Sequence, residues 1–423
     1  MINYIIRNAH DQNDIDQLKP LFNKVFHPEN VGDLAEVMSH HLPGLKPDHW
    51  FVAEDPTSTS IVSAFALIPW QWKMAGIPLK VAEMGIVGTH PNHQGKGLMK
   101  RLNHRFDHRL QEENYDLAVI QGIPGFYHKF GYHYCVPLEN HMEIPLHLMD
   151  ESSETDYVIR EATLKDIPFL KQQDELYRQK YFLSVNRPKD QWAYLLTHSK
   201  ETEYGADYWI IEHPKGEHYY ARMPYTGFGY GLIISEVSEQ ISWPAMEALM
   251  AFAKREAIKK EKPYIRLNLH HDSIAAQWAI QKGVQPGLSY AWQIKIINKC
   301  SLLQKMKPIL ERRVLNSSFK GWNKTVRLDL YGEQIDLKWE KGHLKAISIG
   351  SDQEVSHTYC IPSDLFALLI LGHRSWQELQ FNRPDIAPML QYIKPDVNHL
   401  AEETGALIET LFPKCQSWIY EQY

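Results

Sequence analysis

The sequence predicts an α/β chain in three parts, with two copies of one mixed α/β unit followed by a smaller α+β unit. Three observations support this prediction. An internal repeat indicates the two copies, and alternating strands indicate the third part. In the first copy, a strand is followed by a glycine-bearing turn and a helix, an order that indicates a binding site. A length of 423 residues fits two to four domains, and 44% hydrophobic with 23% charged residues is typical of packed globular protein.

The repeat relates the start of the chain to residues near 160. Tyr4–Arg7 recurs as Tyr157–Arg160, and in both places a β-branched strand leads into an amphipathic helix, with an acidic N-cap expected at Asp14 and at Asp166. The copies also end alike, at predicted strands 116–120 and 265–269. This spacing indicates duplication of a unit of about 145 residues, the size of one domain.

Between the copies, residues 149–156 are short, polar and acidic, which predicts a linker. An alternating strand at 290–296 predicts the end of the second copy. We therefore expect domains at residues 1–150, 151–297 and 298–423.

The third part has a different pattern. Residues 326–331 and 334–339 alternate at period two around Gly332-Glu333, which predicts a hairpin, and a further strand is expected at 344–349. Ser363-Asp364 is expected to cap a helix at 365–371 that ends at Gly372. A second helix is expected at 397–412.

The most informative stretch lies in the first copy. An apolar strand at 83–88 runs through Thr89-His90-Pro91 into Gln94–Met99 and then a helix. Glycines 95 and 97 let the backbone approach an anion, and the free N–H groups at the start of the helix favour negative charge. The nearby cations are Lys100, Arg101 and Arg105. The stretch therefore predicts a phosphate site, and it matches neither the Rossmann fingerprint nor a P-loop.

Composition and charge exclude several other functions. A net charge of −6 argues against sequence-independent binding of nucleic acid. The four cysteines, Cys135, Cys300, Cys360 and Cys415, form no Cys-x-x-Cys pair, and the 22 histidines show no metal-ligand spacing, so no metal site is expected. No apolar run is long enough for a membrane span or a signal peptide, which favours a cytoplasmic setting.

The Gln-x-x-Gly spacing resembles the acetyl-coenzyme A loop of the GCN5-related N-acetyltransferases (GNAT), with Gln94 and Gly97 matching and Met99 departing from the pattern. The segment Phe126–Tyr132 resembles the Tyr-x-x-Phe-Gly-Tyr segment of the Eis (enhanced intracellular survival) family, and the third part resembles that family's sterol-carrier-protein-like (SCP2-like) domain. The resemblance covers the whole chain, but only the first part carries specific motifs. It implies tandem GNAT folds, each with a mixed, splayed sheet and flanking helices, followed by an SCP2-like α+β domain.

The resemblance also implies acetyl-coenzyme A as the acetyl donor. The implied contacts lie on the splayed strand, on the glycine turn and after the next strand, at Ile86, Val87, Gly88, Gln94, Gly95, Lys96, Gly97, Leu98, Met99, Gly122 and Ile123. Backbone groups at 86–88 are expected to hold the pantetheine arm and the thioester oxygen.

Acyl transfer to an amine needs a neutral amine, fixed donors for the thioester oxygen and a proton for the leaving thiolate. The resemblance implies Tyr127 as the general acid and the Tyr423 carboxylate, at the end of an aromatic tail, as the base. Glu83 lies eleven residues before Gln94. Because that spacing is like that of the catalytic glutamate in histone-type acetyltransferases, Glu83 is either the alternative base or an acceptor-binding group. The second copy lacks the Gln-x-x-Gly loop and has Ala279 in place of Tyr127, so we expect it to be inactive.

These patterns predict an acetyl-CoA-dependent N-acetyltransferase that moves an acetyl group directly to a primary amine of a cationic acceptor, such as an aminoglycoside, a polyamine or a lysine, through a ternary complex. The resemblance adds a bacterial source and a homo-oligomer such as a hexamer. Two alternatives stay open, a FemABX-type aminoacyl transferase and a non-enzymatic lipid- or sterol-binding protein. The intact loop and acidic charge argue against the first, and the lack of a long apolar stretch in the third part argues against the second.

Overall fold

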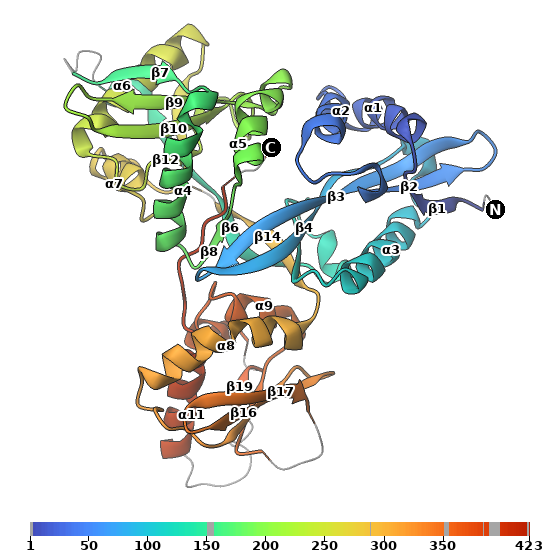
Figure 1. Cartoon of the computed structure of the whole chain (residues 1–423), viewed down its shortest axis with the longest axis vertical. Helices are drawn as coiled ribbons and strands as arrows, with labels where there is room; N and C mark the ends of the chain where they lie inside the picture. The colour runs from blue at the N-terminus through green and yellow to red at the C-terminus, as the bar shows by residue number, and fades with distance from the viewer. Residues whose placement is uncertain are drawn as a thin grey trace.

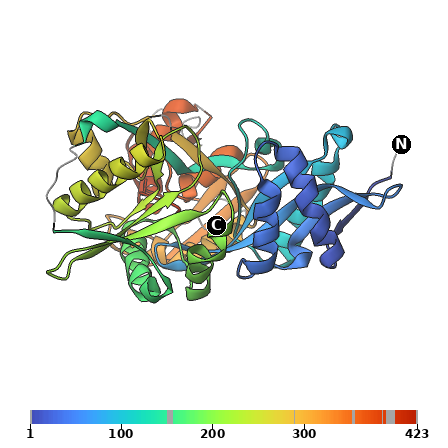
Figure 2. The same ribbon diagram turned by 90° about the horizontal axis from the view of Figure 1, so that it is seen from above.

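The computed structural model describes residues 3–149, 156–287, 289–350, 355–383, 385–388, 398–420 and 423. Figure 1 shows three lobes that meet at the middle of the molecule, and Figure 2 shows them from above. No helix within the described ranges combines the length and apolar character that crossing a membrane requires.

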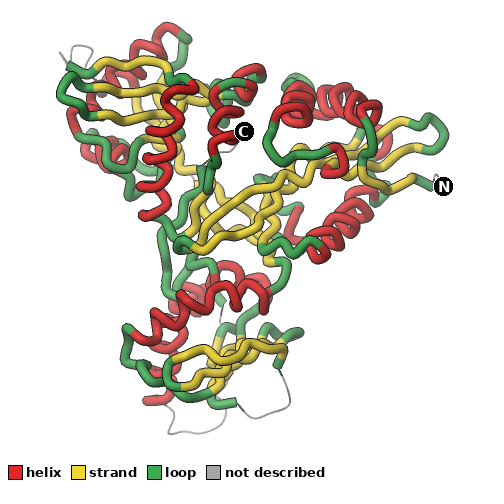
Figure 3. The backbone as a smooth tube through the Cα atoms, in the orientation of Figure 1, coloured by secondary structure: helices red, strands yellow, loops and turns green. Residues whose placement is uncertain are grey.

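The N-terminal lobe is a sheet with α1 and α2 on one face and α3 on the other (Figures 1 and 3). Its elements are β1 (Ile5–Asn8), α1 (Gln12–Phe26), α2 (Val31–His41), β2 (Trp50–Asp55), β3 (Ser60–Met74), β4 (Ile77–Thr89), α3 (Leu98–Glu112), β5 (Leu117–Ile120) and β6 (His133–Pro145), with 3₁₀ turns at Pro47–His49, Pro91–His93, Tyr127–Phe130 and Leu146–Leu148. The N-cap of α1 is Asp11, whose side chain accepts from the N–H of Asp14. The expected cap at Asp14 is therefore wrong, because Asp14 lies in the first turn and binds Arg7 instead.

The second lobe also combines helices and strands. Its elements are β7 (Val158–Glu161), α4 (Ile167–Lys180), β8 (Leu183–Val185), α5 (Lys189–Leu196), β9 (Ala206–Glu212), β10 (His218–Pro224), β11 (Leu232–Ile234), β12 (Glu236–Val237), α6 (Trp243–Lys259), β13 (Tyr264–Asn268), α7 (Ile274–Gln281) and β14 (Ser289–Ile296), with 3₁₀ turns at Leu164–Asp166 and His198–Glu201. Asp166 is the N-cap of α4, as expected. Residues 150–155 of the expected linker lie outside the described residues.

The third lobe is α+β. Its elements are α8 (Lys299–Leu315), β15 (Thr325–Asp329), β16 (Gln334–Glu340), β17 (His343–Ile349), β18 (His357–Cys360), α9 (Ser363–Ile370), α10 (Trp376–Asn382), β19 (Ala387–Pro388) and α11 (Asn398–Leu411). The predicted hairpin, third strand and two helices are present, and Gly372 has a left-handed φ of 69° just after α9. The expected cap is wrong, because the N-cap of α9 is Pro362 and Ser363-Asp364 opens the helix.

One sheet runs through the first two lobes. Its strand order is β1-β2-β3-β4-β5-β14-β6-β13-β11, and β8 pairs with β3. The last strand of the second copy, β14, therefore lies between β5 and β6 of the first, while β6 pairs with β13. The expected boundaries at 150 and 297 stay predictions, since strands cross between the lobes. The remaining sheets are β12-β10-β9-β7 and β17-β16-β15-β18-β19.

The two copies of the internal repeat have similar strand pairing and similar ion pairs. Ile5 pairs with Glu54 across β1 and β2, and Val158 pairs with Glu212 across β7 and β9. In each copy one arginine binds two carboxylates at 2.6 to 2.8 Å: Arg7 with Asp14 and Glu54, and Arg160 with Asp166 and Glu212. That the second lobe is itself a GNAT fold stays a prediction.

The C-terminal tail returns from the third lobe and runs between the other two (Figure 1). It forms a short ladder beside β8, in which Phe182 N–H donates to Gln416 O at 2.7 Å and Trp418 N–H donates to Leu183 O at 3.3 Å. The aromatic tail is buried there, since Trp418 and Tyr420 are both 3% exposed.

Candidate active site

The sheet opens where β4 and β5 part. They pair in parallel only from Val81↔Leu117 to Glu83↔Val119, after which β5 ends while β4 continues to Thr89. A bulge in β4 accompanies the opening, and Ile86 has a φ of 51°. Such a φ is a true outlier for a β-branched residue, so the surrounding structure must hold it in place. Beyond Glu83, β4 therefore stays paired with β3 on one edge, while its edge toward β5 has no strand partner among the described residues.

The glycine turn lies beside this opening. Gly95 and Gly97 both have a φ of 72°, and a Cβ at either position would meet no atom within 4 Å. Gly97 is the N-cap of α3 and makes no side-chain cap hydrogen bond. The first N–H groups of α3 therefore receive no side-chain cap from Gly97, and the helix dipole at this end favours an anion.

A cavity of about 730 Å³ joins the turn to the end of β4 and to the Tyr127 segment. Its lining is Val25, Val87, Thr89, His93, Gln94, Gly95, Lys96, Gly97, Leu98, Met99, Lys100, Ile123, Phe126, Tyr127, Lys129 and Phe130. This lining includes three lysines and neither Asp nor Glu, although the chain carries a net charge of −6. The positive charge and the apolar side chains of this lining therefore suit an anionic ligand with an apolar portion.

Two expected cations do not reach this cavity. Arg101 donates to the carbonyl of Tyr4 at 2.9 Å, and Arg105 donates to Asn8 Oδ1 at 2.6 Å, so both hold α3 against β1. Lys100 lines the cavity, as does Lys129, whose ammonium lies 3.6 Å from the centre of the Phe126 ring.

Of the predicted donor contacts, Val87, Gln94–Met99 and Ile123 line the cavity, whereas Ile86, Gly88 and Gly122 do not. Gly88 makes room for α1, because a Cβ there would lie 2.9 Å from Phe22 Cδ1. Sequence reasoning missed Val25, Thr89, His93, Phe126, Lys129 and Phe130 as lining residues. Phe126, Lys129 and Phe130 lie inside the quoted aromatic motif, which could have identified them, but Val25 on α1 gave no signal.

Tyr127 is 5% exposed and begins a 3₁₀ turn, and its side chain borders the cavity. Its hydroxyl makes no hydrogen bond with any residue in the described ranges. Burial raises the pKa of Tyr127 to about 12, so the phenol is protonated at neutral pH and can donate.

Gly122 makes space for this tyrosine. A Cβ at Gly122 would lie 2.3 Å from Tyr127 Cδ2. Two side chains of β14 hold the Gly122 carbonyl: Gln293 Nε2 donates to it at 2.8 Å, and the Tyr290 hydroxyl donates as well. A strand from the second copy thus positions the loop that carries Tyr127.

The two residues that carry the candidate bases lie in contact, through the phenolic hydroxyl of Tyr423 and the carboxylate of Glu83. Glu83 is 2% exposed and accepts hydrogen bonds from Trp70 Nε1 at 2.7 Å, from the Tyr423 hydroxyl at 3.0 Å and from Gln121 Nε2 at 3.4 Å. The Tyr423 ring also stacks on Trp70, with ring centres 6.0 Å apart. Glu83 therefore anchors the last residue of the tail beside the opening of the sheet.

The second copy has a turn with the same hydrogen-bond pattern but carries Ala279 where the first has Tyr127. The N–H of Tyr132 bonds to Tyr127 O, and the N–H of Val284 bonds to Ala279 O in the same five-residue pattern. Ala279 is fully buried and has no proton to give. The N-terminus of α6 is also capped already, because the Ser242 side chain accepts from the third N–H. Both features favour an inactive second copy.

Comparisons with known proteins agree with this geometry. A family model for an acetyltransferase (GNAT) domain matches residues 6–135. A conserved protein of unknown function from Enterococcus faecalis V583, described as a probable N-acyltransferase, has a similar structure, with a TM-score of 0.69, 14% identity and 100% of each chain covered. A GCN5-related N-acetyltransferase from Anabaena variabilis ATCC 29413 gives a TM-score of 0.66, 14% identity and 99% coverage of each chain.

Eis1 from Mycobacterium abscessus is also similar, with a TM-score of 0.59, 11% identity, and coverage of 99% of this chain and 100% of that one. No curated protein sequence matches significantly. At these identities the solved structures show a shared fold along the whole chain. The protein therefore contains a GNAT acetyltransferase domain, in the residues that hold the splayed strand, the glycine turn and Tyr127, and is an acetyltransferase by that domain.

Proposed function

We propose that the protein transfers an acetyl group from acetyl-CoA directly to a primary amine of a cationic acceptor, such as an aminoglycoside, a polyamine or a lysine side chain, within a ternary complex. One observation carries the proposal: a single cavity joins an uncapped helix N-terminus and three lysines to a buried tyrosine whose hydroxyl has no partner in the described chain. GNAT domains use acetyl-CoA as their donor, and the cavity fits its two ends.

The donor's phosphates suit the turn at Gln94–Met99, where the N–H groups of α3 and the side chains of Lys96 and Lys100 supply positive charge. Its apolar, amide-bearing arm suits the edge of β4 at 86–88, which does not pair with β5 and borders the cavity at Val87, and which could bind a ligand as it would a strand. Phe126, Phe130 and Met99 supply apolar walls between these regions.

In the transfer, the amine nitrogen forms a bond to the thioester carbonyl carbon and the carbon–sulfur bond breaks. Tyr127 would donate its phenolic proton to the departing sulfur, a role that its protonated state at neutral pH supports. A base must take a proton from the amine, and N–H groups of the β4 bulge would stabilise the charge on the carbonyl oxygen.

We assign the base to the Tyr423 carboxylate. Glu83 is a weaker candidate because its oxygens accept hydrogen bonds from Trp70, Gln121 and Tyr423 itself. Extending the chain by one glycine beyond Tyr423 should lower kcat about as much as Tyr127→Phe, since the charge moves away. Glu83→Gln should mainly raise KM for cationic acceptors. Full activity of the extended chain together with an inactive Glu83→Gln variant would transfer the role to Glu83.

Two measurements test the function as a whole. Native mass spectrometry of gently purified protein should find coenzyme A, whereas a bound lipid would favour a carrier. Thiol release from acetyl-CoA across a panel of polyamines, aminoglycosides and lysine peptides should then identify the acceptor class. Failure of every amine, with aminoacyl-tRNA accepted as donor instead, would favour a FemABX-type enzyme.

The full-length similarity to Eis1 supports an Eis-like architecture, and we propose an SCP2-like fold for the third lobe on its five-stranded sheet with α8, α9, α10 and α11. Homo-oligomerisation is a further proposal, which light scattering on a size-exclusion column tests.

A further inference from the structure

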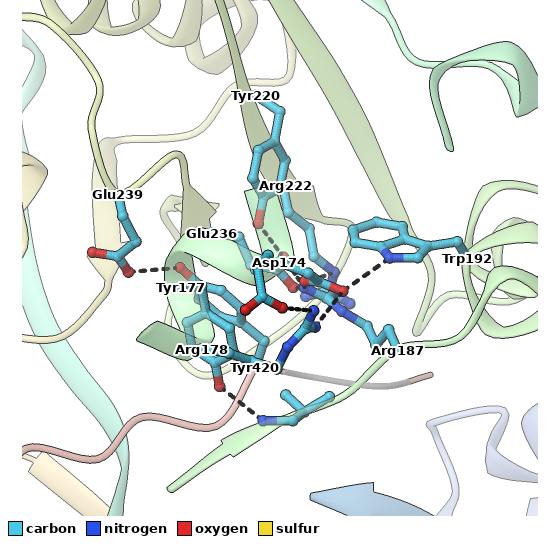
Figure 4. Close-up of polar contacts among 12 residues, drawn as sticks. Asp174, Tyr177, Arg178, Arg187, Trp192, Tyr220, Arg222, Glu236, Glu239 and Tyr420 are labelled. Carbon is cyan, nitrogen blue, oxygen red and sulfur yellow. Dashed lines mark hydrogen bonds and ion pairs between the residues drawn. The ribbon is translucent and has the colours of Figure 1, made fainter. Parts of the chain in front are cut away.

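A cluster of buried charges lies in the second lobe, against the C-terminal tail (Figure 4). Arg222 and Glu236 are 0% exposed, and Arg187 and Asp174 are 1% exposed. Burying charged side chains costs free energy unless each group is paired. Because we expect this lobe to be inactive, a catalytic role within it does not explain the cluster.

The two arginines are paired differently. Arg187 binds both oxygens of Glu236 at 2.9 Å and Asp174 Oδ1 at 2.9 Å. Arg222 lies farther from the acids, with its Nε 3.9 Å from Glu236 Oε1, and donates through Nη1 to Ser235 Oγ at 2.9 Å. The carboxylates of Asp174 and Glu236 thus make closer contacts with Arg187 than with Arg222.

The C-terminal tail packs against this cluster and brings Tyr423 close to Arg222. Tyr420 stacks on Tyr177 with ring centres 4.2 Å apart and donates to Glu239 at 3.2 Å (Figure 4). The Tyr177 hydroxyl donates to Trp418 O. These contacts fix the tail immediately before its last residues. Arg222 Nη2 then lies 3.5 Å from the main-chain oxygen of Tyr423.

We propose that Arg222 is a positioning residue, which holds the terminal carboxylate of Tyr423 beside the catalytic domain. The inference rests on the proposed function of that carboxylate as base. It also gives the second lobe a role, because that lobe would supply the counter-charge for a group that acts in the first. Tyr423 is then held at both ends, by Glu83 through its hydroxyl and by Arg222 through its carboxylate.

The arrangement predicts a measurable electrostatic effect. A carboxylate beside a guanidinium stays ionised to lower pH than one without a partner. Arg222→Gln should therefore move the acid limb of the kcat/KM profile upward by about one pH unit, since an opposite charge at this range shifts titration by ~1 to 3 units. It should also lower kcat by about 10- to 100-fold through misplacement of the base, with acetyl-CoA affinity unchanged. Arg222→Lys keeps the charge and should keep the wild-type acid limb.

Arg266→Gln is the matched control. Arg266 is 2% exposed, lies in the same lobe and is 3.7 Å from Glu139, but it makes no described contact with the tail. Its replacement should lower the melting temperature without moving the acid limb. A merely structural role for Arg222 would make the two glutamine variants behave alike.

A double-mutant cycle with the glycine-extended chain separates the two explanations. If Arg222 acts through the carboxylate, Arg222→Gln should cause little further loss once the tail is extended. Losses that multiply in the double variant, or a folded Arg222→Gln enzyme with a wild-type pH profile, would overturn the proposal.

The contact can also be measured without catalysis. In protein that is expressed with Tyr423 as its last residue and labelled with [1-¹³C]tyrosine, the Tyr423 carboxylate is the one labelled carbonyl that titrates, because the other labelled carbonyls lie in peptide bonds. Arg222→Gln should raise its titration midpoint by about one pH unit, and Arg222→Lys should not. An unchanged midpoint would refute the contact, whereas a shifted midpoint in a protein that acetylates no amine would refute only the proposed function.

Discussion

Replacing Gly122 with alanine should disable the enzyme by moving the Tyr127 ring, although Gly122 itself does not line the cavity proposed for the donor. The added Cβ would lie 2.3 Å from Tyr127 Cδ2, 2.4 Å from Cε2 and 3.2 Å from Gln293 Nε2. The ring must retreat by about 1 Å to reach ordinary van der Waals contact. Gly122 does not have a left-handed φ, so the cost is steric and not conformational.

The magnitude follows from this displacement. A misplacement of about 1 Å in a catalytic group costs roughly 100-fold in rate, and overpacking a tight site costs about 1 to 3 kcal/mol of stability. We therefore expect kcat to fall about 100-fold, with acetyl-CoA affinity within about threefold of wild type. Thiol release gives kcat, calorimetry gives the affinity, and thermal unfolding shows whether the variant is folded.

Gly125→Ala is the matched control on the same loop. A Cβ at Gly125 meets no atom within 4 Å, and its φ of 71° makes the cost one of backbone strain, about 1 to 2 kcal/mol. It should lower the melting temperature yet leave kcat near wild type. A folded Gly122→Ala enzyme with wild-type kcat would refute the placement of Tyr127 as the acid.

Four further predictions concern the same site. Tyr127→Phe should lower kcat by ~10²- to 10⁴-fold with donor binding retained, because the ring still packs; equal rates for the two proteins would remove Tyr127 from the mechanism. Because burial raises the pKa of Tyr127 to about 12 from an unfolded value near 10, its protonated form is fully present below pH 10 and is lost only toward pH 12. Tyr127 should therefore cause no alkaline fall in rate below pH 10, which a kcat profile checks. Gly97→Glu places a carboxylate and a strained φ at the N-terminus of α3 and should abolish acetyl-CoA binding in calorimetry. Titration should find one acetyl-CoA per chain, because the second copy has a capped helix and Ala279, and a stoichiometry of two would contradict its assignment as inactive.

Patterns within short segments of the sequence predicted much of the secondary structure. Period-two alternation located the strands of the third lobe, and glycines at 95 and 97 located a turn that requires left-handed backbone, because both signals depend on residues close in sequence. The repeat gave the matching starts of the two copies. At the caps the two copies differ: Asp14 and Asp166 each bind the arginine of the preceding strand, yet Asp11 caps α1 whereas Asp166 is the N-cap of α4.

Some features of the candidate active site were predictable from the sequence, whereas others depend on tertiary structure. The sequence determined the glycine turn, the motif around Tyr127 and the aromatic tail, each a short stretch whose chemistry is local. Tertiary structure alone decided that β14 would lie between β5 and β6 to hold the Gly122 carbonyl, that Val25 would line the cavity, and that Tyr423 would meet Glu83 across 340 positions of sequence. Contacts between distant segments depend on which strand edges and faces are left to pair once the cores have packed, and no periodicity within one segment specifies that choice.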